Sequence, residues 1–225
     1  MNRNLLTAAA LITAPLLWTA AANADVITTG GSAGTVSFTK LASGGVSFTT
    51  AGFTTNPAAF QSPNGTTLIT GTTTFGAMAG TTGAENAMGV FPITPAVTES
   101  FTFTAVTGAT GSMTGTITWP GIKDGTNTPA FDVNAAFTVT SDTVTNPIFL
   151  ADFPVGGSGQ PDFTLNLSVG TTLTGLATGA STTGTYSSGE LVPTPSRVPE
   201  PASLTLLGSA FIGLGWLGRR KKKAA

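Results

Sequence analysis

Carboxylates carry most of the chemistry that this sequence offers. The chain has 225 residues with no cysteine and no histidine. Without cysteine there are no thiol nucleophiles and no thiolate metal sites. Without histidine the chain lacks the usual general base near neutral pH and the commonest transition-metal ligand. Ser-His-Asp, Cys-His and His-ligated zinc hydrolase mechanisms are therefore excluded.

Two glutamates could in principle form a glycosidase pair. Glu85 and Glu99 are the only glutamates ahead of residue 187. Glycosidases place two carboxyl groups on either side of the bond that they cleave. The flanking residues 83–86 and 98–100 look like an ordinary loop and an ordinary strand start. We therefore expect a protein without enzymatic activity, and an exported hydrolase using Glu85 or Glu99 is only a third hypothesis.

Aspartates recur at a spacing of ten residues and raise the question of a metal site. They are Asp132, Asp142, Asp152 and Asp162, with Asp124 eight residues before the first. Carboxylates and loop carbonyls are calcium ligands, so Asp124 and Asp132 are the calcium candidates. The loop at 123–127 lacks the dense ligand pattern of a calcium-binding loop. The alternative is one solvating carboxylate per strand or turn, which protects sheet edges. No other metal or cofactor is expected.

Trp119 and Tyr186 are candidates for a sugar-stacking surface. Trp119 precedes Pro120-Gly121, where a strand would end at a loop. Trp119 also lies in phase with Ile117, which favours the alternative of a core residue. If Trp119 lies on the surface, it is a candidate for contact with carbohydrate.

An alternation of apolar and polar residues predicts the strands that must position these groups. Such a period of two is typical of strands with one face buried and threonine on the other. The apolar sets are Phe101 with Phe103; Met113, Ile117 and Trp119; Phe131, Val133, Ala135, Phe137 and Val139; and Phe163, Leu165, Leu167 and Val169.

Turn signals place further strands between these sets. The segments 35–41 and 46–53 form a predicted hairpin that turns at 43–45, and the strand 66–75 follows the turn 63–65. Strands are also predicted at 173–177 and 182–186. The stretch 76–95 is expected to be a long irregular connection, with a short helix near Glu85.

About nine short strands with regular turn signals indicate an all-β fold, an antiparallel β-sandwich or jelly-roll-like domain. The alternative is a low-complexity, partly disordered stalk rich in threonine and glycine. Most phenylalanines fall at period-two positions, which a disordered stalk has no reason to maintain. The folded domain is therefore favoured.

The charge of the central region excludes one class of partner. Between residues 25 and 196 there are two basic residues, Lys40 and Lys123, against nine acidic ones, a net charge of −7. Such a surface repels phosphates and lacks the basic patch that nucleic-acid binding requires. We therefore expect no nucleic-acid partner.

The N-terminus has the pattern of a secretory signal peptide. Arg3 forms a minimal positive region, an apolar run follows over 5–18, and Ala22-Asn23-Ala24 fits a small-residue cleavage site. Cleavage between Ala24 and Asp25 is expected. The alternative is an uncleaved N-terminal anchor.

The C-terminus combines a rigid peptide, an apolar run and a basic tail. Pro199 and Pro201 keep the backbone around Glu200 extended. The apolar residues 202–218 are close to the minimum of roughly 17–25 needed to cross a bilayer. The basic tail should stay in the cytoplasm; it consists of Arg219, Arg220, Lys221, Lys222 and Lys223.

This end of the chain resembles the PEP-CTERM sorting signal of proteins that exosortases process. The resemblance rests on Val198, Pro199, Glu200 and Pro201, on the glycine-interrupted apolar run, and on the basic tail. It implies export through the Sec translocon and recognition by an exosortase in the inner membrane. It also implies cleavage near the Pro-Glu-Pro tripeptide. The alternative is a plain single-span anchor behind a proline-rich stalk.

The expected organisation follows from these parts. A signal peptide covers 1–24, a β-sandwich domain 25–191, a proline-rich linker 192–198, and the sorting signal with a short transmembrane helix 199–225. Signal peptidase and the inner membrane are expected partners before processing, and exopolysaccharide is one afterwards. The predicted function is that of a structural protein of the cell surface or biofilm matrix in a Gram-negative-type bacterium. The alternative is a carbohydrate- or surface-binding adhesin that calcium could stabilise.

Overall fold

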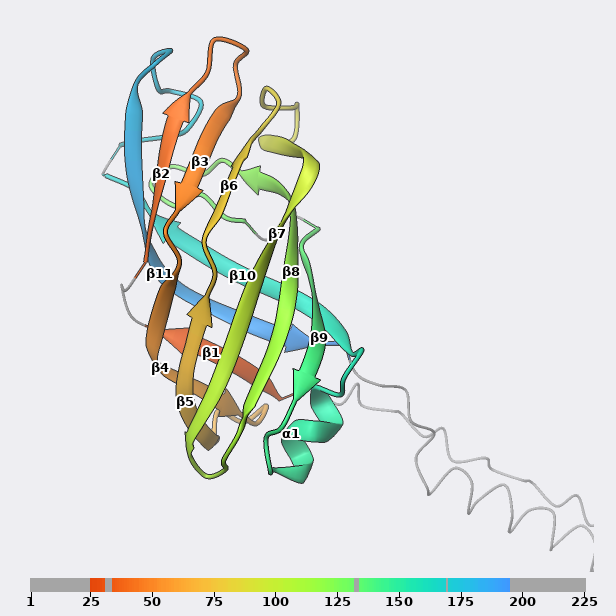
Figure 1. The fold of residues 1–225 in the computed structure, drawn as a ribbon. Coiled ribbons are helices and arrows are strands. Elements are labelled where there is room, and N and C mark those ends of the chain that lie inside the picture. Colours follow the sequence, from red (N-terminus) through yellow and green to blue (C-terminus); the bar gives the residue numbers. More distant parts are fainter. Residues whose placement is uncertain (1–24, 31–33, 132–133, 169, 195–225) are drawn as a thin grey trace, which may run out of the picture.

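The computed structural model describes residues 25–30, 34–131, 134–168 and 170–194, and these form an all-β domain with one short helix (Figure 1). The elements in chain order are β1 (Val26–Gly30), β2 (Thr35–Lys40), β3 (Val46–Thr50), β4 (Phe53–Gln61), β5 (Thr67–Phe75), β6 (Met78–Thr81), β7 (Val90–Thr107), β8 (Ser112–Lys123), β9 (Ala136–Asp142), α1 (Pro147–Asp152), β10 (Ser158–Asn166) and β11 (Ser181–Pro193).

The strands closely follow the predicted alternation. In β10 the residues at every second position are buried, among them Phe163 and Leu165, while the residues between them are half-buried or exposed. The same holds for Phe101 and Phe103 in β7. Threonines occupy much of the opposite face, where a β-branched polar side chain fits a solvated sheet. The prediction of an all-β fold is confirmed.

Eight antiparallel strands close into a ring. Strand β1 pairs with β4 on one side and with β11 on the other, so that Ile27 lies opposite both Phe60 and Leu191. The ring runs β1-β4-β5-β7-β8-β9-β10-β11 and returns to β1. The sandwich or jelly roll expected from the sequence is therefore replaced by a closed barrel, because the first and last strands pair and leave no open edge between them.

Three further strands extend the barrel at the end opposite α1 (Figure 1). The first half of β11 pairs with β2, and β3 and β6 follow in the sheet. The predicted hairpin is confirmed as β2 and β3, with Phe38 directly opposite Phe48. An isolated bridge between Thr82 and Ile93 connects this extension to the beginning of β7.

About half of the segment predicted as a long irregular connection is strand. Strand β6 occupies part of it, β7 begins at Val90, and there is no helix near Glu85. The pairing of β7 with β8 shifts register between Pro92 and Val97. This irregularity accommodates the prolines, which lack the N–H that a regular ladder needs.

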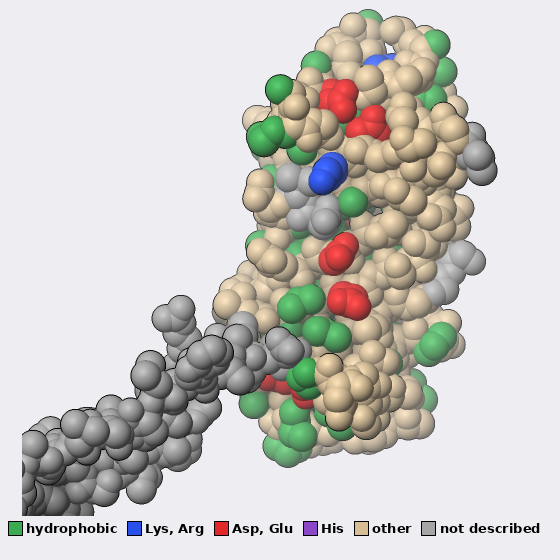
Figure 2. Space-filling view, turned by 180° about the vertical axis from the view of Figure 1, so that it is seen from behind, with side chains coloured by type: hydrophobic (Ala, Val, Ile, Leu, Met, Phe, Trp, Pro, Cys, Tyr) green, Lys and Arg blue, Asp and Glu red, His purple; other side chains and the backbone are tan. Residues whose placement is uncertain are grey.

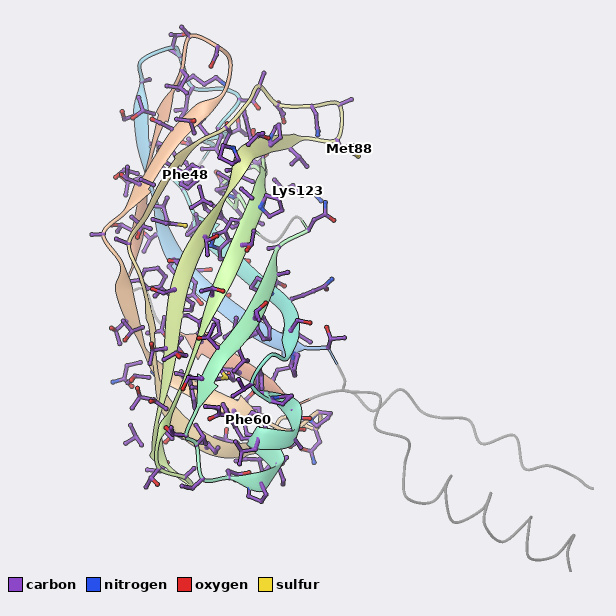
Figure 3. The ribbon with its side chains drawn as sticks, turned by 45° about the vertical axis from the view of Figure 1, so that its right-hand side comes forward. Phe48, Phe60, Met88 and Lys123 are labelled. Atoms are coloured by element: carbon purple, nitrogen blue, oxygen red, sulfur yellow. The ribbon has the colours of Figure 1, made fainter. Side chains whose placement is uncertain are left out.

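The barrel interior is filled mainly by aromatic side chains. Phe60 contacts Phe149 with 5.0 Å between ring centroids, and Phe75 contacts Phe163 at the same distance. Figure 3 labels Phe60 near α1 and Phe48 in the opposite half of the molecule, so the core extends along the whole domain. Aromatic burial on this scale is the main source of stability in a chain without disulfides.

Two segments near the end of the folded domain differ from the structure that the sequence predicts. Residues 173–177 form turns rather than the predicted strand. Strand β11 continues to Pro193, where Pro193 lies opposite Gly159 of β10, so the folded domain reaches past residue 191 into the predicted linker. Pro193 is tolerated because it is the last residue of its strand.

Helix α1 was not predicted. Asn146 caps it, with its side-chain oxygen accepting hydrogen bonds from the backbone N–H groups of Ile148 and Phe149 at 2.9 and 3.2 Å. Pro147 occupies the first turn, where its missing N–H costs nothing. Among the described residues no helix is long and apolar enough to span a bilayer. The predicted signal peptide and C-terminal transmembrane helix lie outside those residues.

Candidate functional site

The aspartates proposed for calcium lie in different parts of the fold. Asp124 accepts hydrogen bonds from the backbone N–H groups of Leu173 and Thr174 at 2.9 and 3.0 Å, so it joins the 123–127 loop to the turns before β11. Asp142 accepts one from the N–H of Val144 at the end of β9. Asp132 lies outside the described residues. Within the described part, no three acidic side chains come together as a metal site.

Glu85 and Glu99 have different environments. Glu85 is half-buried in the loop before β7 and accepts a hydrogen bond from the Thr174 hydroxyl. Glu99 is a core residue of β7 with only 3% of its surface exposed.

Trp119 is buried, as the alternative of a core residue predicted, and is not placed for contact with a sugar. Its side chain is 1% exposed, and its ring packs edge-on against Phe131 and Phe163 with 5.7 and 5.3 Å between centroids. Trp119 and Ile117 lie on the same face of β8, and both side chains point into the barrel. Tyr186 is likewise 2% exposed. Neither ring presents a face on which a sugar could stack.

The most unusual group in the interior is the carboxyl of Glu99. It occupies a position in phase with Phe101 and Phe103 and lies opposite Ile117 across the sheet. The indole N–H of Trp119 donates to its Oε2 at 3.0 Å, whereas its Oε1 is buried without a hydrogen-bond partner. Burial raises the pKa of Glu99 to about 7, and the hydrogen bond from Trp119 opposes this only in part.

A second buried polar contact lies between β1 and β11. The hydroxyl of Tyr186 is within hydrogen-bonding distance of the Thr29 hydroxyl, which donates to the carbonyl of Gly189 at 3.1 Å. Burial raises the pKa of Tyr186, so it stays a neutral phenol. This contact satisfies polar groups at the seam where the ring closes, which is a structural role.

A groove of about 460 Å³ lies over β1, β4, β5, β10 and β11. Hydroxyl and amide side chains supply much of its lining, including Thr28, Gln61 and Thr164. Asp162 and Glu190 also line it and face each other directly across β10 and β11. No local sequence pattern indicates this groove, because its residues come from five separate strands.

The expected processing sites lie at or beyond the ends of the described chain. Ala22 and Ala24 lie outside it, and Asp25 is its first residue. The backbone of Asp25 hydrogen-bonds to Asp152 of α1. Desolvation raises the pKa of Asp152 to about 6, with repulsion from the Asp25 carboxylate as the second cause.

The comparison with protein families bears on the C-terminus. The family model for the PEP-CTERM protein-sorting motif matches residues 197–221. The chain carries a PEP-CTERM sorting motif. The match includes Val198, Pro199, Glu200 and Pro201 and the basic residues from Arg219 to Lys221; Lys222 and Lys223 follow it. All of these residues lie outside the described structure.

The PEP-CTERM motif indicates an exported protein that an exosortase sorts. The match covers only the end of the chain and assigns no family to the barrel. A search of the curated proteins finds no match to this chain, and neither does a search of the solved structures.

Proposed function

We propose that this protein is a non-enzymatic structural component of the cell surface or of the exopolysaccharide matrix, delivered there by its PEP-CTERM motif. The observation that carries the proposal is the match at 197–221, which begins shortly after β11 ends at Pro193. A folded barrel is thus joined to a sorting motif by a very short connection. The signal peptide at 1–24 would direct the chain to the Sec translocon and signal peptidase.

The barrel has properties that a passive cargo needs. Side chains that are neither charged nor hydrophobic, together with backbone, cover most of the face seen in Figure 2. Glu99, the one strongly perturbed carboxyl of the core, is in contact with Trp119 and is closed off from solvent. These features support a role that depends on a stable fold rather than on a reaction.

The sorting proposal is tested in the producing bacterium by substitution of the motif. Glu200→Ala, and separately deletion of residues 219–223, should stop processing at the C-terminus and leave a precursor with a larger intact mass in the membrane fraction. Glu190→Ala is the matched control, because it makes the same change on an exposed position of β11. Normal processing and location of the Glu200→Ala protein would contradict the proposal.

The groove favours a second candidate, a carbohydrate-binding adhesin. Its hydroxyl, amide and carboxylate groups can exchange hydrogen bonds with sugar hydroxyls, although no aromatic ring lines it. Asp162 and Glu190 supply the carboxylates of this lining. Calcium is the ion that the alternative would use.

Binding of the mature protein to isolated matrix polysaccharide, with and without a chelator, separates the two candidates. Under the adhesin hypothesis Glu190→Gln should weaken binding, and Glu85→Gln, the same change outside the groove, should leave it unchanged. If the mature protein binds no polysaccharide at any concentration, the adhesin hypothesis is contradicted and the structural role is supported.

A further inference from the structure

Exposed apolar side chains gather at the end of the barrel that carries α1. Ile148 is 50% exposed, Leu150 41% and Val155 63%, and Pro147 and Ala151 are exposed beside them. Phe149 and Phe153 point inward and anchor the helix, so the outer side of α1 and the following turn is apolar apart from Asp152. We call Pro147, Ile148, Leu150, Ala151 and Val155 the α1 patch. Figure 2 shows hydrophobic side chains at this lower end of the molecule.

The α1 patch lies directly beside the point where the folded domain ends. The backbone N–H of Thr194 donates to the carbonyl of Ser158 at 2.8 Å. Ser158 begins β10, three residues after Val155. The chain therefore leaves the barrel close to Val155 of the α1 patch.

The length of chain that follows limits how far this end can be from a membrane. Residues 195–201 separate Thr194 from the apolar stretch 202–218. Seven residues span at most about 25 Å when fully extended. If 202–218 is inserted in a bilayer, the end of the barrel with α1 must stay within that distance of the lipid surface.

We propose that the α1 patch rests on the lipid surface of the inner membrane while the precursor is still anchored, and so holds the barrel in one orientation next to the exosortase. This inference depends on the proposed function, because it requires that the C-terminal stretch enters the membrane. We propose a bilayer as the partner of the α1 patch, because the short connection to residues 202–218 keeps the patch near the membrane until the C-terminus is cleaved.

The charges around the α1 patch are compatible with this contact. Described basic residues are limited to Lys40 and Lys123, and neither belongs to α1 or its flanking turns. Carboxyls nearby include Asp25, Asp142 and Asp152, and burial raises the pKa of all three, which lowers the cost of bringing them to an anionic surface. Contact would therefore depend on apolar burial rather than on electrostatic attraction.

The absence of cysteine makes a site-specific test direct. Full-length protein with Val155→Cys is labelled with an NBD fluorophore and reconstituted in phosphatidylethanolamine–phosphatidylglycerol vesicles. Met88→Cys is the matched control: Met88 is an exposed apolar residue, 78% accessible, at the end of the barrel far from α1 (Figure 3). Nitroxide groups on the lipid acyl chains act as the quencher.

The expected result is a blue-shifted NBD emission at position 155 that the lipid nitroxides quench, with no loss of emission at position 88. Equal emission and equal quenching at both positions would overturn the inference. A blue shift at 155 that grows with protein density and is insensitive to the nitroxides would also overturn it, because a second copy would then cover the patch.

Resistance of the C-terminal segment to alkaline extraction is measured on the same vesicles. If the segment is extracted, the membrane anchoring in the proposed function fails. If it stays in the bilayer and position 155 is not quenched, only the orientation of the barrel is wrong.

Discussion

Replacement of Glu99 by glutamine should remove a pH-dependent loss of stability. Glutamine keeps the shape of the side chain and an oxygen that accepts from Trp119, but it cannot ionise. The carboxyl of Glu99 is 3% exposed, and its pKa rises from an ordinary value of 4.5 to about 7. The substitution therefore isolates the effect of one buried charge.

The sign follows from which state ionises first. Below pH 4.5 Glu99 is neutral in both the folded and the unfolded chain, so it has no effect on stability. As the pH rises from 4.5 to about 7, the unfolded chain ionises while the folded barrel keeps the proton, and the folded state loses stability. Above about pH 7 both states are ionised and the loss is constant.

The magnitude follows from the same two values. One pKa unit corresponds to about 1.4 kcal/mol, so the full loss is about 3 kcal/mol. For a domain of this size that amount changes the melting temperature by on the order of 10 °C. At pH 8 the Glu99→Gln protein should be more stable than the wild type by about this amount, and at pH 4.5 the two should be similar.

Thermal and urea unfolding between pH 4.5 and 8.5 measure this difference. After loss of both ends, Trp119 is the only tryptophan left, so its fluorescence reports directly on the Glu99 environment. Glu85→Gln is the control for the same chemical change on a loop residue outside the core. If Glu99→Gln has the same pH slope as the wild type, or is the less stable protein at pH 8, then the reasoning about the buried charge is wrong.

Three further changes test the packing by urea unfolding. Phe149→Ala should cost about 3–5 kcal/mol, because it removes a fully buried ring in contact with Phe60; an unchanged midpoint would show that the helix contributes nothing. Asn146→Ala should cost about 1 kcal/mol through loss of the helix cap, and a neutral effect would argue against that cap. In Gly115→Ala the new methyl group would come within 2.5 Å of the Phe101 ring, so a loss of about 1–3 kcal/mol is expected; a stabilised variant would contradict the close approach of β8 to that ring.

The sequence was sufficient where a strand has a regular apolar face. The strands around Phe38, Phe101 and Phe163 were predicted because alternation depends only on the pleat of each strand. Strand β4 was missed because Pro57 interrupts its pattern, and the register shift between Thr55 and Ala58 that accommodates it belongs to the pairing with β5. A register shift allows a proline within a strand, but the shift itself cannot be recognised from the local sequence.

The closure of the ring could not be derived from alternation. A period of two shows which side chains point inward, but it does not show which strands pair with each other. The pairing of Ile27 with Leu191 joins segments at the two ends of the domain. Helix α1 is a different case, since Asn146 followed by Pro147 is a recognisable helix start that the short length of the helix obscured.

For the candidate site, the sequence identifies residues that could act chemically, but it does not show whether they are buried or exposed. The sorting motif is a local sequence and was recognised directly, whereas burial decides the roles of Trp119 and Glu99. The groove combines residues from five strands, and one-dimensional spacing cannot bring them together.

The seam between β1 and β11 has a consequence for the order of events during secretion. A polypeptide that crosses a membrane with its N-terminus leading delivers β1 first and β11 last, so the ring stays open until nearly the whole domain has emerged. Under the proposed function, the apolar stretch 202–218 follows only a few residues later and stops translocation. Completion of the barrel and arrest of translocation are thus almost simultaneous, and any delay in the arrival of β11 leaves the unpaired first strand exposed to other chains.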